Sequence, residues 1–266
     1  MPATAAIRTL TEAGDLRTWS LIVTIFGDMA RTPGAELPGP VLSEITARIG
    51  VKPEAMRVAL HRLRKDGWIA SRRVGRVSHY RLTASGLAES ERATARIFAR
   101  RTPPPERWHV AVAGPLDPGA RLALEGAMAE HMPIAAGVWL GQGPAPTTLP
   151  PGLFTIDGSA LGLPDWLRDG LMPPELARCY AAFDARVARV ATHLAGGDAT
   201  LALLDRTAIR ILLVHGWRRL VLRHAALPDA VFPRGWAGPR VRDRVHGLLD
   251  RLGQPTIREL ADTASV

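Results

Sequence analysis

Cysteine is almost absent from this chain of 266 residues, in which Cys179 stands alone. A single thiol rules out an intramolecular disulfide and fits a protein that works in a reducing compartment. Residues 1–19 also lack an apolar run long enough to serve as the core of a signal peptide. We therefore expect a cytoplasmic protein.

Long hydrophobic runs are missing too. The most apolar stretch, AIRILLVHGWRRLVL at residues 208–222, is interrupted by Arg210, His215, Arg218 and Arg219. It is too short for a membrane span, which needs about 20 apolar residues. We interpret it as a buried helix and expect no membrane partner.

The residue patterns that signal common enzymes are lacking as well. The eight histidines form no close pair at metal-ligand spacing, which together with the single cysteine argues against a zinc site. No serine lies in a nucleophile-elbow sequence, and the apolar stretch WHVAVAG (108–114) offers no carboxylate for a metal-dependent nuclease. The sequence therefore predicts no enzyme, no catalytic or metal-binding residue and no resident cofactor.

Positive charge, by contrast, is abundant. The formal net charge is +9, and nearly all of the basic residues are arginines, since Lys52 and Lys65 are the only lysines. Such a balance indicates a polyanionic partner, which can be nucleic acid, a phosphorylated metabolite or an anionic membrane surface. A coding bias towards arginine and alanine explains the same total charge. The positions of the basic residues are therefore more informative about a partner than their number.

Proline and glycine divide the chain into three predicted domains. The sequence TPPPE at 102–106 is the best boundary, because consecutive prolines favour a stiff extended backbone. We predict several helices and one hairpin in residues 1–101, and only helices in residues 161–266. Residues 102–160 are predicted to form a small α+β domain with a strand, a helix and two strands, at 108–114, 120–131, 135–141 and 153–158. The predicted fold class is therefore a multidomain α+β protein.

Two helices and a hairpin are predicted in the first domain. A helix that begins near Pro53 places Met56, Leu60 and Leu63 on one narrow face, and Gly67 ends it. A shorter amphipathic helix precedes it at 42–50, with Leu42, Ile45 and Ile49 facing inward. After Gly67, the alternating segments WIASRR and VSHYRL surround Val74-Gly75-Arg76 and predict a tight hairpin. This order is a helix-turn-helix followed by a wing.

The chemistry of this region suits duplex DNA, because a recognition helix fits the major groove and wing arginines reach phosphates or the adjacent minor groove. The predicted recognition helix presents Val58, His61 and Arg62 to base edges, and Arg57, Arg64 and Lys65 to phosphates. The predicted wing contributes Arg72, Arg73, Arg76 and Arg81, which would supply sequence-independent attraction. The alternative interpretation is that these charges form only a solvated helix face and hairpin.

Two long segments resemble the PaaX family of transcriptional repressors, which control phenylacetic acid degradation. They are RTWSLIVTIFGDMA (17–30) with VLSEITARIGVKPEAMRVALHRLRKDGWIASRRVGRVSHYRLTASG (41–86), and LLVHGWRRLVLRHAALPDAVFPRGWAG (212–238). The segment at 212–238 is similar to that family's C-terminal signature of His-x-Trp-Arg-Arg, Leu-Pro and Trp-x-Gly. The resemblance covers nearly the whole chain and is specific at its two ends.

The resemblance implies a homodimer that binds inverted-repeat operator DNA and is released by an aryl-CoA thioester such as phenylacetyl-CoA. It also implies a central domain with a ferredoxin-like (Cas2-like) fold, between the N-terminal winged helix-turn-helix and an all-helical C-terminal domain. The sequence departs from the family at the end of the first central strand, which here reads Ala113-Gly114-Pro115-Leu116.

A ligand site is predicted on the C-terminal helix. His215, Arg218 and Arg219 lie three or four residues apart and share one side, with Arg223 close behind. Arginines suit the phosphates of CoA, and Trp217 offers a flat apolar wall. The alternative is that Trp217 packs in the core while the arginines pair with acidic residues.

The leading hypothesis is a cytoplasmic DNA-binding repressor of aromatic catabolism. A competing hypothesis is an enzyme that acts on a CoA thioester and carries the basic winged helix as an accessory module. A third keeps DNA binding but makes the protein an activator or an architectural factor.

Overall fold

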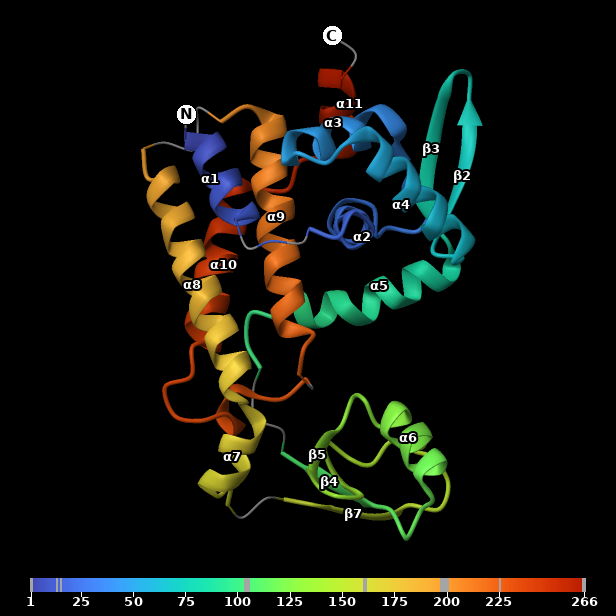
Figure 1. The fold of residues 1–266 in the computed structure, drawn as a ribbon, viewed down its shortest axis with the longest axis vertical. Coiled ribbons are helices and arrows are strands. Elements are labelled where there is room, and N and C mark those ends of the chain that lie inside the picture. The colour runs from blue at the N-terminus through green and yellow to red at the C-terminus, as the bar shows by residue number, and fades with distance from the viewer. Residues whose placement is uncertain are drawn as a thin grey trace. The chain divides into compact units, whose positions relative to one another are not determined.

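The computed structural model describes residues 2–12, 14, 16–102, 106–159, 162–196, 201–224 and 226–264. These described residues form eleven α-helices, one short 3-10 helix and seven strands in two antiparallel sheets (Figure 1). The predicted α+β class is confirmed at this level. Among the described residues, none of the helices is long and apolar enough to cross a membrane.

The chain forms two compact units. Unit 1 contains Met1–Phe98, Ala182–Val221 and Arg240–Val266, and unit 2 contains Ala99–Ala181 and Leu222–Pro239. Unit 1 thus combines residues of the expected N-terminal and C-terminal domains. The division into domains at 1–101, 102–160 and 161–266 stays a prediction. The boundaries of the two packing units lie elsewhere.

Unit 1 is built around one buried helix. This helix, α9 (Leu203–Val221), packs against α1 (Pro2–Thr11), α2 (Thr18–Met29), α3 (Gly39–Ile49) and α5 (Ala84–Ile97), among others (Figure 1). Twelve of its residues are buried, so the prediction of a buried helix at this place is confirmed. The remaining helices of the unit are α4 (Pro53–Lys65), α10 (Gly238–Leu252) and α11 (Ile257–Ala264), and α8 (Pro174–Leu194) begins in unit 2 and ends in unit 1.

A buried ion pair ties three helices of unit 1 together. Arg210 of α9 donates from Nε and Nη2 to both carboxylate oxygens of Asp28 in α2, over 2.7 and 2.8 Å. The same guanidinium donates to the carbonyls of Leu249 and Gly253 at the end of α10. Nearly all N–H groups of the Arg210 guanidinium thus have acceptors. The pair therefore meets the condition under which a buried charge is tolerated.

The sheet of unit 1 has three strands in the order β1-β3-β2. The strands are β1 (Leu37–Pro38), β2 (Ile69–Val74) and β3 (Val77–Leu82). The hairpin of β2 and β3 pairs regularly from Ile69↔Leu82 to Val74↔Val77, as the sequence predicted. The two-residue strand β1 was not expected.

The sheet of unit 2 has four strands in the order β5-β6-β4-β7, all antiparallel. Its elements are β4 (Trp108–Val112), α6 (Pro118–Ala127), β5 (Met132–Ala135), β6 (Val138–Gln142) and β7 (Phe154–Gly158). The predicted strand, helix, strand and strand correspond to β4, α6, β6 and β7, and β5 is an additional strand. The helix α7 (Asp165–Leu171) and the 3-10 helix η2 (Asp229–Val231) complete the unit.

Each face of this second sheet packs against a different layer. One face buries Trp108, Met132 and Leu140 together with Leu227 and Phe232. The opposite face buries Ala111, Met128 and Trp139, which lie in β4, directly after α6, and in β6. Apolar residues thus lie on both faces of this antiparallel sheet.

Candidate nucleic-acid interface

The helix α4 has the amphipathic pattern that the sequence predicted. Pro53 stands in its first turn, where its missing N–H removes no hydrogen bond, and Met56, Leu60 and Leu63 are buried. The helix ends because Gly67 adopts a left-handed conformation, with φ of 72°. The N–H of Gly67 then donates to the carbonyl of Arg64 and that of Trp68 to the carbonyl of Leu63, which is a Schellman motif.

The opposite face of α4 is open to solvent. All six predicted recognition residues are exposed, namely Arg57, Val58, His61, Arg62, Arg64 and Lys65. Val58 is 69% exposed although it is apolar and β-branched, so packing does not account for its presence. A single exposed apolar side chain is common on protein surfaces, but this one lies among five basic or histidine side chains.

The side chain of Thr83 links the hairpin to the end of α4. Thr83 follows β3, and its hydroxyl donates to the carbonyl of Gly67 over 2.6 Å. Thr83 also caps α5 by accepting a hydrogen bond from the N–H of Gly86. A Cβ added to Gly86 would lie 2.2 Å from the carbonyl oxygen of Trp68, so only glycine allows this approach. The residues between Gly67 and Gly86 therefore hold the helix and hairpin in one arrangement.

Several cations on this surface are oriented by nearby side chains. Arg57 forms an ion pair with Glu54 at 2.8 Å, and Arg62 lies 3.5 Å from Asp66. The guanidinium of Arg62 also lies over the ring of Trp19, 5.4 Å from its centroid, a cation–π contact. Trp19 was not predicted to take part, because no sequence pattern links it to a residue so far along the chain.

Arg72 is the most strongly held of the wing arginines. Its Nε and Nη2 donate to the two carboxylate oxygens of Glu36 over 2.6 and 2.7 Å. This hydrogen bonding lowers the pKa of Glu36 and raises the pKa of Arg72. His79, the cross-strand partner of Arg72, places its Nδ1 3.7 Å from the same carboxylate. Glu36 is a second residue that the sequence did not reveal, since it precedes the short strand β1.

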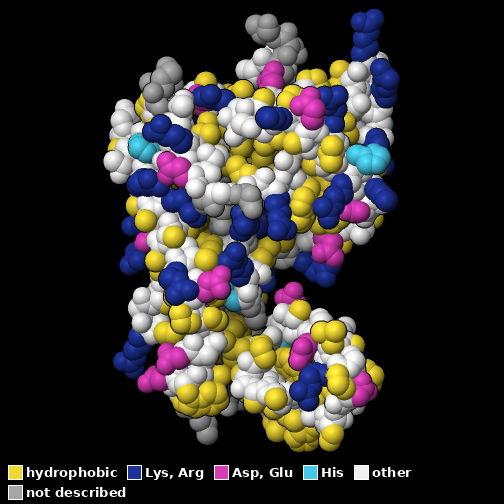
Figure 2. Space-filling view, viewed as in Figure 1, with side chains coloured by type: hydrophobic (Ala, Val, Ile, Leu, Met, Phe, Trp, Pro, Cys, Tyr) yellow, Lys and Arg dark blue, Asp and Glu magenta, His cyan; other side chains and the backbone are white. Residues whose placement is uncertain are grey.

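The remaining cations form no ion pair with an acidic side chain within the part of the chain that the structure describes, although the charge of Arg81 acts on Glu36. Arg64 donates to the hydroxyl of Ser71, and Arg73 donates to the carbonyl of Gly75 at the hairpin tip. The other members of this group are Lys65, Arg76 and Arg81, and all five side chains are exposed. Figure 2 shows Lys and Arg side chains along the hairpin and at its tip. The exposed face of α4 and the hairpin thus form one electropositive surface, which we call the helix–hairpin surface.

The C-terminal ligand candidates do not all come together. Trp217 is fully buried, and its Nε1 donates to the carbonyl of Ile97 over 2.8 Å. His215 is also buried, with its Nδ1 3.0 Å from the hydroxyl oxygen of Thr24. Burial, and then the charges of Arg218 and Arg219, lower the pKa of His215 to about 4. A neutral imidazole packed against α2 and a core tryptophan favour the packing interpretation that the sequence left open.

The three arginines of this predicted ligand site lie in different surroundings. Arg218 donates to the carbonyl of Ser20 in α2 over 3.3 Å, and burial lowers its pKa. Arg219 is exposed, whereas Arg223 belongs to unit 2 and donates to the sulfur of Cys179 over 3.2 Å. The structure therefore brings His215 and Arg218 together at Ser20 and Thr24, but not the whole predicted set.

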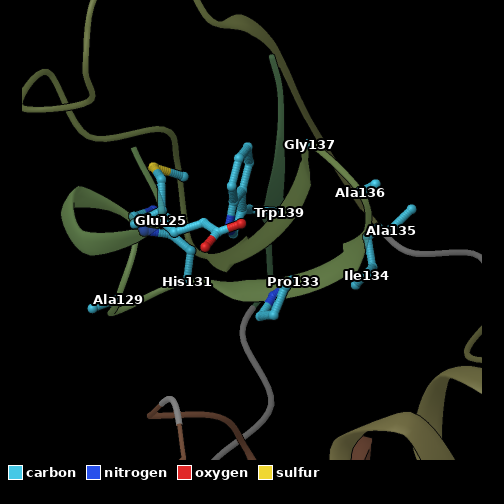
Figure 3. A pocket seen from close by; sticks show the side chains of 10 residues that line it. Glu125, Ala129, His131, Pro133, Ile134, Ala135, Ala136, Gly137 and Trp139 are labelled. Atoms are coloured by element: carbon cyan, nitrogen blue, oxygen red, sulfur yellow. The ribbon is translucent and has the colours of Figure 1, made fainter. Parts of the chain in front are cut away.

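Unit 2 contains a separate open cavity of about 620 Å³ between the end of α6 and the β5–β6 hairpin (Figure 3). Trp139, Met128 and Ile134 contribute apolar walls, while Glu125 and His131 add polar groups. The Nε2 atoms of His131 and of buried His109 are 3.0 Å apart, and burial, then His109, lower the pKa of His131. None of the described residues that line this cavity is an arginine or a lysine, so the cavity does not suit the phosphates of a CoA group.

The protein is therefore an α+β protein of two compact units, one of which carries an exposed basic helix followed by a basic hairpin. The family model described as PaaX-like protein matches residues 17–86, and that described as PaaX-like protein C-terminal domain matches residues 173–260. Together they cover more than half of the chain, and the helix–hairpin surface lies inside the first match. The chain belongs to the PaaX family.

Two further comparisons concern one relative and one solved structure. The chain is 27% identical over 260 residues to the transcriptional repressor PaaX of Escherichia coli strain K12, covering 88% of this chain and 79% of that protein. It is also similar to the solved structure of the uncharacterized protein Rv0674 from Mycobacterium tuberculosis, at 20% identity and a TM-score of 0.54. That likeness covers 95% of this chain and 100% of the other, and it shows the fold alone.

Proposed function

We propose that this protein is a DNA-binding transcriptional repressor of aromatic catabolism genes. The observation that carries the proposal is the helix–hairpin surface, on which every predicted recognition and wing residue is exposed. The name of the Escherichia coli relative, a transcriptional repressor, supports the direction of regulation. A repressor of this kind acts in the cytoplasm, where its operator lies.

The region from α3 to β3 fits a winged helix-turn-helix. The connection between α3 and α4 contains only Gly50, Val51 and Lys52, and Gly50 has a left-handed φ of 94° that allows the chain to turn sharply. The second helix, α4, is then the recognition helix. Its exposed side chains have the chemistry of major-groove readout, since arginine can donate twice to guanine and an apolar group such as Val58 can contact the methyl group of thymine.

The wing would supply affinity rather than sequence discrimination. Arg73 and Arg76 form no ion pair with a carboxylate among the described residues, so their charges are available to phosphates. Arg81 is also exposed, although its charge acts on Glu36 as well. Arg72 differs from them because Glu36 already neutralises its charge. We therefore assign Arg72 to holding the hairpin against the loop before β1, with a phosphate contact only when Glu36 is displaced.

The sheet of unit 2 fits a ferredoxin-like, Cas2-like domain. If the four strands of this unit are numbered along the chain, their order in the sheet, read from the β7 edge, is 4-1-3-2. Neighbouring strands are antiparallel. The helix α6 connects the first strand to the second. The second helix expected in that fold is replaced by the connection between Gln142 and Phe154. The strand order of a ferredoxin-like unit is thus matched, whereas its full set of helices is not.

The proposed assembly is a homodimer, because an inverted-repeat operator requires two recognition helices related by a twofold axis. The proposed effector is an aryl-CoA thioester such as phenylacetyl-CoA, which would release the dimer from DNA. Of the predicted effector residues, Arg219 and Arg223 are exposed, whereas Trp217 is buried.

Binding to the protein's own upstream DNA tests this function. Mobility shift or anisotropy would be measured alone and with phenylacetyl-CoA, using phenylacetate and free CoA as matched controls. We expect specific binding that only the thioester releases. Specific binding that ignores all three compounds would keep the regulator and reject the effector, and binding without preference over random DNA would reject the winged-helix assignment.

The competing enzyme is tested in the same samples by following hydrolysis of phenylacetyl-CoA. The buried, neutral ring of His215, with Nδ1 at Thr24, is poorly placed to reach a substrate. We expect no turnover. Thioester loss that the His215→Ala variant abolishes would favour the enzyme instead.

A further inference from the structure

Two buried or half-buried side chains of α9, His215 and Arg218, are directed at a helix that also contacts the helix–hairpin surface. That helix is α2, which packs against α9 and against α4 (Figure 1). All three helices belong to unit 1, so the contacts between them lie within one compact body. The helix α2 therefore links the C-terminal part of the chain to the proposed recognition helix.

The link to α4 is the contact between Trp19 and Arg62. The guanidinium carbon of Arg62 lies 5.4 Å from the centroid of the Trp19 ring, and its Nε lies 3.5 Å from a carboxylate oxygen of Asp66. Trp19 is half-buried, whereas the side chain of Arg62 is 63% exposed. The tryptophan is thus the more fixed member of the pair, and it restrains a side chain that is otherwise free to move.

Such a restraint matters for an arginine that reads a base. Two hydrogen bonds to one guanine require the planar guanidinium to have one orientation. Immobilising a long side chain on binding lowers affinity, and a contact that holds the side chain beforehand removes part of this cost. Trp19 and Asp66 provide contacts of this kind for Arg62.

The turn of α2 that carries Trp19 is not fixed by a cap of its own. Among the described residues, the side chain of its N-cap residue, Arg17, makes no capping hydrogen bond, and no acidic residue lies in the first turn. Both are common ways to stabilise the start of a helix. The position of Trp19 therefore depends on the helices that pack against α2.

The helix α9 supplies polar contacts at this place. The Nη1 of Arg218 donates to the carbonyl and the hydroxyl of Ser20, over 3.3 and 3.4 Å, and to the hydroxyl of Thr24 over 3.4 Å. None of these acceptors is a carboxylate. The guanidinium is thus used to hold the first two turns of α2 and not to form an ion pair there.

His215 completes the same hydrogen-bond network. The hydroxyl of Thr24 donates its single hydrogen to the carbonyl of Ser20 over 3.0 Å. It can therefore only accept from the ring of His215, whose Nδ1 lies 3.0 Å away. The Nε2 of His215 has no hydrogen-bond partner within the described part of the chain, which fits a neutral ring that carries its proton on Nδ1.

We propose that Trp19 is a positioning residue of the helix–hairpin surface, which holds Arg62 for contact with a base, and that Arg218 and His215 fix the turn that carries Trp19. The inference rests on the proposed DNA binding and gives two residues of the C-terminal signature a part in it. Losing one of these contacts lowers discrimination between DNA sequences. It leaves the attraction of the wing arginines to phosphates unchanged.

The first test compares the affinities of the full-length protein for its upstream duplex and for a shuffled duplex by fluorescence anisotropy. In Trp19→Leu we expect the ratio of the two affinities to fall about 2- to 5-fold per protomer, the factor that corresponds to an exposed cation–π contact. A variant that only unfolds more easily loses affinity for both duplexes equally, so this ratio does not respond to stability. Trp19→Phe keeps an aromatic ring and should retain most of the ratio.

The matched control is Phe98→Leu. It removes another ring of unit 1 that lies beneath an arginine, since the guanidinium carbon of Arg31 is 4.9 Å from the centroid of Phe98. This pair is not part of the helix–hairpin surface. The ratio should therefore stay at the wild-type value.

A double-mutant cycle shows whether Trp19 acts through Arg62. Once Arg62→Ala has removed the guanidinium, Trp19→Leu should lower the ratio no further. A further fall of the same size would mean that Trp19 acts independently of Arg62, and it would overturn the positioning role.

The contribution of α9 is tested at Thr24. Thr24→Val keeps the shape of the side chain and removes the hydroxyl that both Arg218 and His215 contact. We expect the ratio to fall as in Trp19→Leu, and not to fall further when Arg62 is alanine. Thr24→Ser keeps the hydroxyl and should behave as the wild type. If circular dichroism shows that Thr24→Val does not fold, Arg218→Gln tests the same step at a half-buried position.

The outcomes separate this inference from the proposed function. A wild type that prefers its upstream duplex while Trp19→Leu keeps the same ratio overturns the inference and leaves the repressor in place. A ratio that falls in Trp19→Leu but not in Thr24→Val or Arg218→Gln overturns the part assigned to α9. A wild type without any preference rejects the repressor and the inference together.

Discussion

Replacing Glu36 by glutamine is expected to strengthen binding to DNA of any sequence. In the wild type, both oxygens of Glu36 accept hydrogen bonds from Arg72, at 2.6 and 2.7 Å, and neutralise its charge. Glutamine has nearly the same shape but no charge, so Arg72 would present a full positive charge beside the hairpin. Phosphates would no longer compete with a carboxylate for this guanidinium.

The size of the effect follows from counterion release. The logarithm of the binding constant falls with the logarithm of the salt concentration by about 0.9 for each phosphate contact. If each protomer of a dimer gains one contact, the slope becomes steeper by about 1.8. Doubling the salt concentration would then weaken binding by the variant about 3.5-fold more than binding by the wild type.

Fluorescence anisotropy with the upstream duplex and a shuffled duplex, over a series of salt concentrations, would measure this slope. The control is Glu12→Gln, which removes an equal charge from an exposed ion pair between Glu12, directly after α1, and Arg189 of α8. Affinity for both duplexes should rise by the same factor in Glu36→Gln, and the ratio between them should stay unchanged. An unchanged slope, or an equal change in the control, would refute the assignment of Arg72 to the DNA-facing surface.

Three further predictions concern the division of roles and the stability of unit 1. Arg76→Ala should weaken binding to all duplexes and lower the salt slope by about 1 per site. Arg62→Ala should cost about 1 to 3 kcal/mol of binding free energy on the operator only. Equal losses of affinity for operator and random DNA in both variants, measured by anisotropy, would refute this division. Asp28→Asn should lower the free energy of unfolding in urea by about 3 to 5 kcal/mol, because it leaves Arg210 buried without its carboxylate; a loss under about 1 kcal/mol would contradict the role of the pair. Burial lowers the pKa of His215 from 6.5 to about 4. Between these pH values the unfolded chain binds a proton at this residue and the folded chain does not. The free energy of unfolding should therefore fall by up to about 3 kcal/mol as the pH drops through this window. Urea titrations at several pH values should show a smaller fall in His215→Gln, and an equal fall would count against a buried neutral ring.

The local parts of the structure could be predicted from the sequence, because their signals lie within a few residues. The spacing of Met56, Leu60 and Leu63 predicted the buried face of α4, and Gly67 predicted its end. The alternation around Gly75 predicted the hairpin. In each case the residues that determine the element are also the residues that form it.

Contacts between distant residues could not be predicted in the same way. Glu36 and Arg72 are 36 positions apart, and the strand that follows Glu36 has only two residues. The packing of Trp217 against the carbonyl of Ile97 depends on two helices whose association leaves no periodic signal. For the same reason, the sequence did not show that helices from both ends of the chain share unit 1.

Binding of duplex DNA at specific half-sites is the property that we propose for the helix–hairpin surface. Hydroxyl-radical footprinting of the protein's own upstream DNA tests it most directly. We expect two protected patches whose centres are about 10 base pairs, or a multiple of this, apart. Both patches should be lost in Arg62→Ala at protein concentrations that still protect the wild-type site. Uniform protection without phased patches, or patches that Arg62→Ala leaves unchanged, would contradict this function of the surface.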